Sequence, residues 1–307
     1  MTRVLVVGAG ATGGYFGARL HAAGRDVTFL LRPRRAAQVR ENGLRLTGAG
    51  EPETVTPRVV TADALSGPYG IVLLSVKAAG LRPALEDLAP AVGPDTVIVP
   101  FLNGMAHLDV LNGRFGAAAV LGGVVKVVAK LGPDGEIVRL ARSAGMAVGE
   151  QDGRDTPRLR AVAAALGGAG YDFATPPDIL AAMWHKWVFI ATLTAVTCLL
   201  SGTVGEVAAV PGGPAFATAV LGEAAAVSAA AGFPLPAAER DGVLATATTE
   251  GSPFAPSMYR DLVQGLPTEV EHVLADLTAR ARHFGVGTPL LDLATARLRV
   301  HQNRVAG

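Results

Sequence analysis

A glycine cluster near the start of the chain has the residue types and spacing that suit phosphate binding. It reads Gly8-Ala9-Gly10-Ala11-Thr12-Gly13, fits the pattern G-x-G-x-x-G, follows the apolar run VLVV and opens a helical pattern. In such a turn the first glycine permits the tight bend, the second lets the backbone approach a pyrophosphate, and the third lets helix and strand pack closely. The start of a helix also favours negative charge. We therefore predict a dinucleotide site at Gly8, Gly10, Ala11, Thr12 and Gly13; the alternative is a glycine-rich turn without a ligand.

The end of the second predicted strand indicates which dinucleotide binds. NAD-binding folds usually carry an acid there, which holds the ribose 2′-hydroxyl. Here the strand ends in the letters FLLR at Arg32, and Arg34 and Arg35 follow without a carboxylate. A guanidinium can hold a 2′-phosphate bidentately, whereas a carboxylate would repel it. Arg32 therefore predicts NADP(H), while Arg34 and Arg35 are either further ligands or arginines of an exposed loop.

Two more loops that follow predicted strands carry polar side chains. SVKAAG offers Lys77, and PFLNGMAHLD offers Asn103 followed by Gly104. Ligands of parallel sheets bind outside the carboxyl ends of the strands, and an asparagine can both donate to and accept from an amide. We predict that Lys77 and Asn103 contact the cofactor, against the alternatives of a solvent-exposed lysine and an ordinary Asn-Gly turn.

Lys186 is a candidate general acid. Only four of the 27 basic residues are lysines, so the composition favours arginine wherever a cation merely has to be present. Lys186 nevertheless lies among bulky apolar residues in MWHKWVFIATL. Desolvation lowers the pKa of a lysine, and an ammonium, unlike a guanidinium, can give up its proton. The alternative is a lysine at a helix edge with its stem buried and its charge in water.

The elements that must position these residues alternate in the first half of the chain. VLVVG, DVTFLL, IVLLSV and TVIVPF are apolar throughout and separated by helical segments, which is typical of a doubly wound parallel sheet. GGVVKVVAKLGPDGEIVRL predicts a hairpin at the edge of that sheet, and RLARSAGMAVGE predicts a further strand.

From about Ile179 the pattern is helical almost to the end. We therefore expect an α/β protein with two domains. The first, residues 1–176, is an NADP-binding Rossmann-type domain with a doubly wound parallel sheet. The second, residues 177–307, is all helical.

Composition and charge favour a small-molecule partner. The net charge of +1 over 307 residues provides no strong field for nucleic acid or an anionic membrane. The apolar run from Trp187 to Leu200 spans 14 residues, against roughly 20 for a bilayer, and the N-terminus lacks a secretory signal pattern, so we expect a cytoplasmic protein. Cys198, the one cysteine, predicts packing, and six scattered histidines predict no metal site.

One late segment, PSMYRDLVQGLPTEVEHVL, completes a wider pattern. With VGAGATGGYFGARL, LLR, VKA, FLNGM, the hairpin region and WHKWVF in this order, nearly the whole chain resembles the ketopantoate reductase (2-dehydropantoate 2-reductase) family. The resemblance implies a Rossmann domain followed by an all-helical domain, residues 177–307, that carries the substrate and the catalytic residues. It also implies NADPH-dependent reduction of the 2-oxo group of ketopantoate in pantothenate biosynthesis, and a homodimer formed through the helical domain.

The resemblance also implies roles for individual residues. The catalytic lysine of the family falls on Lys186, its active-site glutamate on Glu269, its substrate-contacting asparagine on Asn103 and its serine on Ser257. Hydride addition to a ketone creates an alkoxide, which Lys186 would stabilise and protonate. Glu269 would keep Lys186 charged or hold a substrate hydroxyl, and Asn103 and Ser257 would hydrogen-bond the substrate carboxylate.

The chain departs from the family pattern along the helix of the lysine. Well-studied members have asparagines four and eight positions after the lysine, on the same helical face, where this chain has Ile190 and Thr194. Both residues are predicted substrate contacts, and an isoleucine cannot hydrogen-bond the hydroxymethyl group of ketopantoate. The sequence thus predicts an NADPH-dependent 2-oxo acid reductase with ketopantoate as default substrate. The alternatives are a less polar 2-oxo acid or carbonyl compound, and a non-catalytic NADP(H)-binding regulator.

Overall fold

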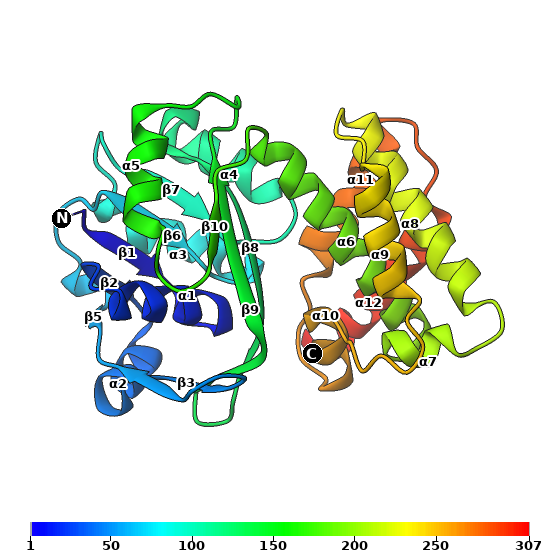
Figure 1. Ribbon diagram of the computed structural model, residues 1–307, viewed down its shortest axis with the longest axis horizontal. Coiled ribbons are helices and arrows are strands. Elements are labelled where there is room, and N and C mark those ends of the chain that lie inside the picture. Colours follow the sequence, from blue (N-terminus) through cyan, green and yellow to red (C-terminus); the bar gives the residue numbers. More distant parts are fainter. Residues whose placement is uncertain (1, 307) are drawn as a thin grey trace. The chain divides into compact units, whose positions relative to one another are not determined.

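The computed structural model describes residues 2–306, and the chain divides into two compact units (Figure 1). The first unit runs to Ile179 except for Asn103–Ala106. That short segment groups with the second unit, which continues from Leu180. The segment that carries Asn103 therefore packs with the helical half of the chain, although it directly follows a strand of the first half.

A parallel five-stranded sheet forms the centre of the first unit. In sheet order its strands are β5 (Arg58–Val60), β2 (Val27–Leu30), β1 (Val4–Val7), β6 (Ile71–Leu74) and β7 (Val97–Pro100). The last four are buried along their whole length, which explains why their sequences are apolar without alternation. All four predicted strands are confirmed, whereas β5 is too short and too exposed to have been predicted.

The register of the sheet decides where the predicted ligand loops lie. Val7, the last residue of β1, pairs with Leu30 at the end of β2 and with Leu74 at the end of β6. The three strands therefore stop at one level, and their following loops leave the same edge of the sheet. Helices then return along the sheet, as expected for a doubly wound fold: α1 (Ala11–Ala22), α2 (Pro33–Asn42), α3 (Leu81–Leu88), α4 (Ala106–Phe115) and α5 (Pro157–Leu166).

A second sheet lies in the same unit and was not predicted. Its path is β10 (Asp172–Ala174), β9 (Ile137–Gly149), β3 (Leu44–Gly48) and β4 (Glu53–Val55), and β8 (Gly122–Leu131) pairs with β9. The predicted hairpin around Gly135 is confirmed as β8 and β9, but its expected place at the edge of the first sheet is wrong, because β9 pairs with β3 and β10. The segment RLARSAGMAVG is in a strand, as predicted, but it continues β9 instead of adding a separate strand.

The second unit is helical, as predicted. Its elements are α6 (Ile179–Leu200), α7 (Val204–Ala208), α8 (Gly213–Ala230), α9 (Ala237–Ala247), α10 (Ser257–Val263), the π-helix η5 (Glu271–Ala275), α11 (Asp276–His283) and α12 (Pro289–Ala306). Short 3-10 turns complete the first unit at η1 (Ala62–Ala64), η2 (Ala78–Gly80), η3 (Ala89–Ala91) and η4 (Ala117–Ala119).

Helix α6 is the apolar centre of the second unit. The apolar run expected to be too short for a bilayer belongs to a helix of 22 residues, so the length argument was wrong: α6 and α8 are both long and apolar enough to cross a membrane. Within the unit, however, 61% of the most apolar window of α6 is buried. A helix that is apolar on all sides and packed against other helices is typical of a protein core.

Candidate active site

The glycines of the cluster differ in whether the surrounding protein leaves room for a side chain. Gly8 has a φ of +95°, and a Cβ atom there would lie 2.6 Å from the carbonyl oxygen of Ser75, at the end of β6. A Cβ on Gly13 would lie 2.4 Å from the carbonyl oxygen of Gly8. Around Gly10, by contrast, no described atom lies within 4 Å of the corresponding point. Gly8 and Gly13 are therefore required by packing within the protein, whereas Gly10 leaves open the space through which a ligand can approach the backbone.

The start of α1 suits an anion. Its N-cap is Gly10, no side chain caps it, and its first turn contains no acidic residue. The N–H groups of Ala11, Thr12 and Gly13 have no partner within the helix, because the first turn of any helix leaves its donors unpaired. Together with the open space at Gly10, these donors fit the pyrophosphate of a dinucleotide.

Two of the predicted basic residues lie on neighbouring loops at the same edge of the sheet. Arg32 is the exposed N-cap of α2, and Lys77 is the exposed N-cap of η2. Gly80, the last residue of η2, faces the arginine: a Cβ there would lie 3.5 Å from Nη2 of Arg32. The structure thus brings Arg32 next to the loop of Lys77, and the lack of a side chain at Gly80 leaves room around the guanidinium.

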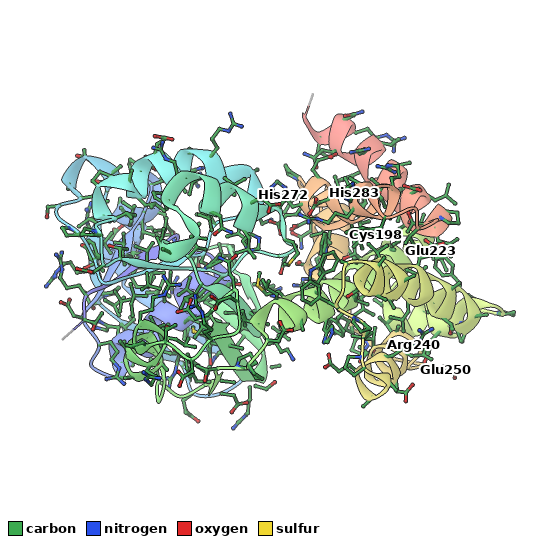
Figure 2. All side chains as sticks on the ribbon, turned by 90° about the horizontal axis from the view of Figure 1, so that it is seen from above. Cys198, Glu223, Arg240, Glu250, His272 and His283 are labelled. Atoms are coloured by element: carbon green, nitrogen blue, oxygen red, sulfur yellow. The ribbon has the colours of Figure 1, made fainter. Side chains whose placement is uncertain are left out.

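The predicted catalytic segments meet within the helical unit. Trp187, the neighbour of Lys186, donates an indole hydrogen bond of 2.8 Å to the carbonyl oxygen of Val273, four residues after Glu269. Gly104, the neighbour of Asn103, packs against both: a Cβ there would lie 2.5 Å from the His272 carbonyl oxygen and 3.7 Å from Cε2 of Trp187. Figure 2 labels His272 on this unit. The segments of Asn103, Lys186 and Glu269, which are far apart in sequence, therefore share one junction.

A π-helix lies at this junction. The turn Glu271–Ala275 is wider than an α-helix, and it begins where the N–H groups of His272 and Val273 both donate to the carbonyl oxygen of Glu269. Single π turns inside helices are frequent at functional sites. Sequence reasoning named Gly104 beside Asn103 but not its packing against the other two segments, and it missed Trp187. The φ of +76° at Gly104 explains why this position of the loop is a glycine.

Comparisons with known proteins agree with this architecture. The sequence profile of the family described as "Ketopantoate reductase PanE/ApbA" matches residues 4–153, and the profile of its C-terminal part matches residues 178–302. An oxidoreductase of Bacillus subtilis, YkpB, whose function is described as uncharacterized, is 32% identical over 98% of this chain and 99% of its own length. The chain belongs to the ketopantoate reductase family.

Solved structures of other oxidoreductases have the same fold as this chain. The 2-dehydropantoate 2-reductase of Geobacter metallireducens has a TM-score of 0.88 and 28% identity, with 97% of this chain and 99% of that chain covered. A D-mandelate dehydrogenase solved with NADH and anilino(oxo)acetate also has a TM-score of 0.88, at 21% identity and with 99% and 100% covered, which shows a common fold alone. As a member of the ketopantoate reductase family, the protein is a pyridine-nucleotide-dependent oxidoreductase that acts on CH–OH groups, which argues against the non-catalytic regulator.

The other predicted substrate residues lie in different surroundings. Ile190 is half-buried on α6, one turn beyond Lys186. Thr194, one turn further, is fully buried, and its hydroxyl makes no hydrogen bond to any described residue. Ser257 is exposed at the first position of α10, and no hydrogen bond of the described residues joins it to the junction. Their contacts with a substrate stay predictions.

Cys198 does not have the properties of a reactive thiol. Cys198, which Figure 2 labels, lies on α6. It is fully buried, and burial raises its pKa to about 12. Among residues 2–306 no group of three or more histidine, cysteine and acidic side chains is placed to hold a metal ion.

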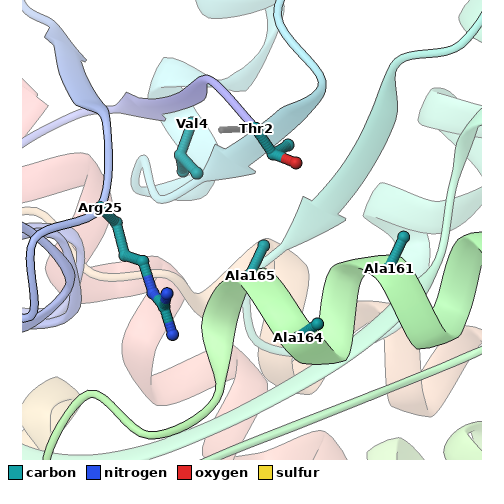
Figure 3. Close-up of a pocket in the computed structure, with 6 residues that line it drawn as sticks. All are labelled: Thr2, Val4, Arg25, Ala161, Ala164 and Ala165. Atoms are coloured by element: carbon teal, nitrogen blue, oxygen red, sulfur yellow. The ribbon is translucent and has the colours of Figure 1, made fainter.

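A cavity of about 330 Å³ in the first unit lies away from the cofactor edge (Figure 3). It is lined by Thr2, Val4, Arg25, Ala161, Ala164 and Ala165. Thr2 and Val4 lie at the start of β1, whereas the glycine cluster follows its end. Because ligands of parallel sheets bind at the carboxyl ends of the strands, and because the lining offers one guanidinium among alanines, this cavity is not a candidate active site.

Trp187→Phe tests the hydrogen bond at the junction. It should lower the free energy of unfolding by about 1 kcal/mol more than Trp184→Phe, the usual net value of one hydrogen bond. Trp184 is a matched control because it is buried in the same helix, packs on Phe233 and makes no indole hydrogen bond to the described residues. Guanidinium denaturation measures both variants. Equal losses would mean that the bond to Val273 contributes nothing to stability.

Proposed function

We propose that the protein reduces a 2-oxo acid to the 2-hydroxy acid with NADPH, and that its default substrate is ketopantoate, reduced to pantoate in pantothenate biosynthesis. The observation that carries the proposal is the junction held by the Trp187 hydrogen bond and Gly104, which gathers the segments of Asn103, Lys186 and Glu269. A panel of 2-oxo acids assayed with NADPH tests it. No turnover of any member would refute the proposed reaction.

The roles of the residues follow from the charge that develops during reduction. The reduced nicotinamide supplies the hydride when it is bound. As the carbonyl oxygen becomes an alkoxide, Lys186 stabilises the charge and transfers a proton to that oxygen. Glu269 keeps Lys186 charged or holds a substrate hydroxyl, and Asn103 and Ser257 hold the substrate carboxylate. We assign cofactor binding to residues 1–176 and substrate binding to residues 177–307, to which Asn103 adds one contact from the segment that groups with the helical unit.

The choice of NADPH rests on Arg32. Its side chain is exposed at the end of β2 beside the loop of Lys77, and the first turn of α2 contains no acid that would repel a 2′-phosphate. The glycine cluster from Gly8 to Gly13 would hold the pyrophosphate, which NADPH and NADH share.

The choice of substrate rests on the helical face of Lys186. Ile190 offers an apolar contact where a hydroxymethyl group requires a polar one, and this favours the alternative of a less polar 2-oxo acid or carbonyl compound. The D-mandelate dehydrogenase of the same fold, solved with an anilino-substituted oxoacetate, supports this alternative by analogy. A homodimer through the helical unit and a cytoplasmic location stay predictions.

Cofactor preference should depend on Arg32. We expect NADPH to bind at least about tenfold more tightly than NADH, since one phosphate contact needs to contribute only about 1.4 kcal/mol. Arg32→Glu should reverse the preference, because its carboxylate repels the 2′-phosphate. Arg34→Glu is the control, since it makes the same change of charge at an exposed neighbouring position and should preserve the preference. Calorimetric titration gives both affinities; equal values in the wild type would contradict the assignment of Arg32.

The chemical step should depend on Lys186. Lys186→Ala should lower kcat by about 100-fold or more, the scale for loss of a general acid, and leave the NADPH affinity within a few-fold. Lys186→Arg should also stay slow, because a guanidinium keeps its proton. Lys130→Ala, an exposed lysine of β8, is the matched control. Activity should also fall at alkaline pH, where Lys186 loses its proton. Near-normal turnover of Lys186→Ala would mean that Lys186 is not the general acid and has a purely structural role.

Substrate choice should depend on position 190. The wild type should discriminate only weakly between ketopantoate and its analogue without the hydroxyl. Ile190→Asn should shift kcat/KM toward ketopantoate by about tenfold or more, the range of one well-placed hydrogen bond. Ile190→Leu, which stays apolar, should leave the ratio unchanged. A strong wild-type preference for ketopantoate that the asparagine does not improve would mean that another residue contacts the hydroxyl.

A further inference from the structure

Arg35 differs from its neighbour Arg34 in its surroundings, although no pattern in the sequence separates the two residues. Both lie in the first turn of α2. Arg34 is exposed and makes no hydrogen bond to the described residues, whereas Arg35 is half-buried. Its guanidinium points toward the glycine cluster: Nε donates a hydrogen bond of 3.1 Å to the carbonyl oxygen of Ala9. A side chain of α2 therefore holds the backbone of the loop predicted to bind the pyrophosphate.

The guanidinium is itself held from the second sheet. Its Nη1 donates to Oε1 of Gln38 at 2.6 Å, and Nε2 of Gln38 donates to the carbonyl oxygen of Asp134 at 2.8 Å, in the turn between β8 and β9. Gly135 of the same turn closes over this pair, since a Cβ there would lie 2.3 Å from Nη1 of Arg35. A continuous set of hydrogen bonds thus runs from the hairpin turn to the glycine cluster.

The charge of Arg35 is only partly compensated within the protein. Its Nη2 atom is buried without a hydrogen bond, and no carboxylate among residues 2–306 forms an ion pair with it. Burial lowers the pKa of Arg35 by desolvating its charge, although a guanidinium stays protonated. A desolvated cation behind a phosphate-binding loop is stabilised when an anion occupies that loop.

We infer that Arg35 is a positioning residue for the glycine cluster: it fixes the Ala9 carbonyl and so supports the pyrophosphate that NADPH and NADH share, whereas Arg32 alone recognises the 2′-phosphate. This inference rests on the proposed function, since it requires that the loop binds a dinucleotide. The turn between β8 and β9 then has a function as well, because its hydrogen bond to Gln38 holds the guanidinium of Arg35 in place.

Titration of both nucleotides into two arginine variants tests the inference. Arg35→Met should raise the Kd values of NADPH and NADH by the same factor, about tenfold, which is the scale for a hydrogen bond to a charged group. Arg32→Met should raise the Kd of NADPH alone. A selective loss of NADPH binding in Arg35→Met would make Arg35 a phosphate ligand and overturn the inference, and so would unchanged affinity for both nucleotides.

Two further measurements keep the inference testable if Arg35→Met folds poorly. Gln38→Leu leaves the guanidinium in place but removes its support, so it should weaken both nucleotides equally by a smaller factor. Amide hydrogen exchange of residues 8–14 in the nucleotide-free protein should be faster in both variants than in the wild type; unchanged exchange would overturn the inference. A wild type that binds neither nucleotide would instead refute the proposed function, and the exchange experiment would still report on the loop.

Discussion

The first unit depends on a close contact between backbones where β1 ends. The turn after β1 lies against the end of β6 so tightly that Gly8 and Gly13 have no room for a Cβ atom. This contact fixes the angle at which α1 leaves the sheet and aims its unpaired N–H groups at the edge where β1, β2 and β6 all stop. The basic residues of the neighbouring loops lie around the same edge, because a parallel sheet in register delivers its loops to one place.

The helical unit is organised around a different constraint, the fixed order of residues along α6. Lys186 and Trp187 are adjacent in sequence, so fixing the indole on Val273 also restricts where the lysine can be. The wide turn at Glu271–Ala275 and the crowded Gly104 complete the junction from two other segments. The residues proposed to react are thus adjacent to packed residues that have no proposed part in proton transfer, and such neighbours restrict flexible side chains to a narrow range of geometry.

Prediction from the sequence succeeded where a local physical requirement determines the type of residue. Short runs such as VLVV and IVLL, bounded by glycines and helical segments, favour a strand that is buried on both faces. The glycine pattern depends on local backbone geometry, so both features were predictable. The second sheet was missed because its strands β3, β4 and β10 are short and only partly buried. In addition, β3 pairs with β9 although about ninety residues separate the paired positions, such as Leu46 and Ile137. The indole hydrogen bond and the different surroundings of Arg34 and Arg35 were also missed, since they depend on tertiary neighbours that no local pattern encodes.

The open space at Gly10 has a consequence for the evolution of such chains. Gly8 and Gly13 are held by the packing of the protein itself, so selection for a stable fold alone is enough to retain them. A side chain at position 10 would meet no described atom within 4 Å, and Gly10 has an ordinary φ, so packing does not oppose its replacement as a ligand at that position would. Among descendants that lose the nucleotide, position 10 should therefore drift first, and a lineage with the outer glycines intact and a bulky residue between them would be recognisable as a former enzyme.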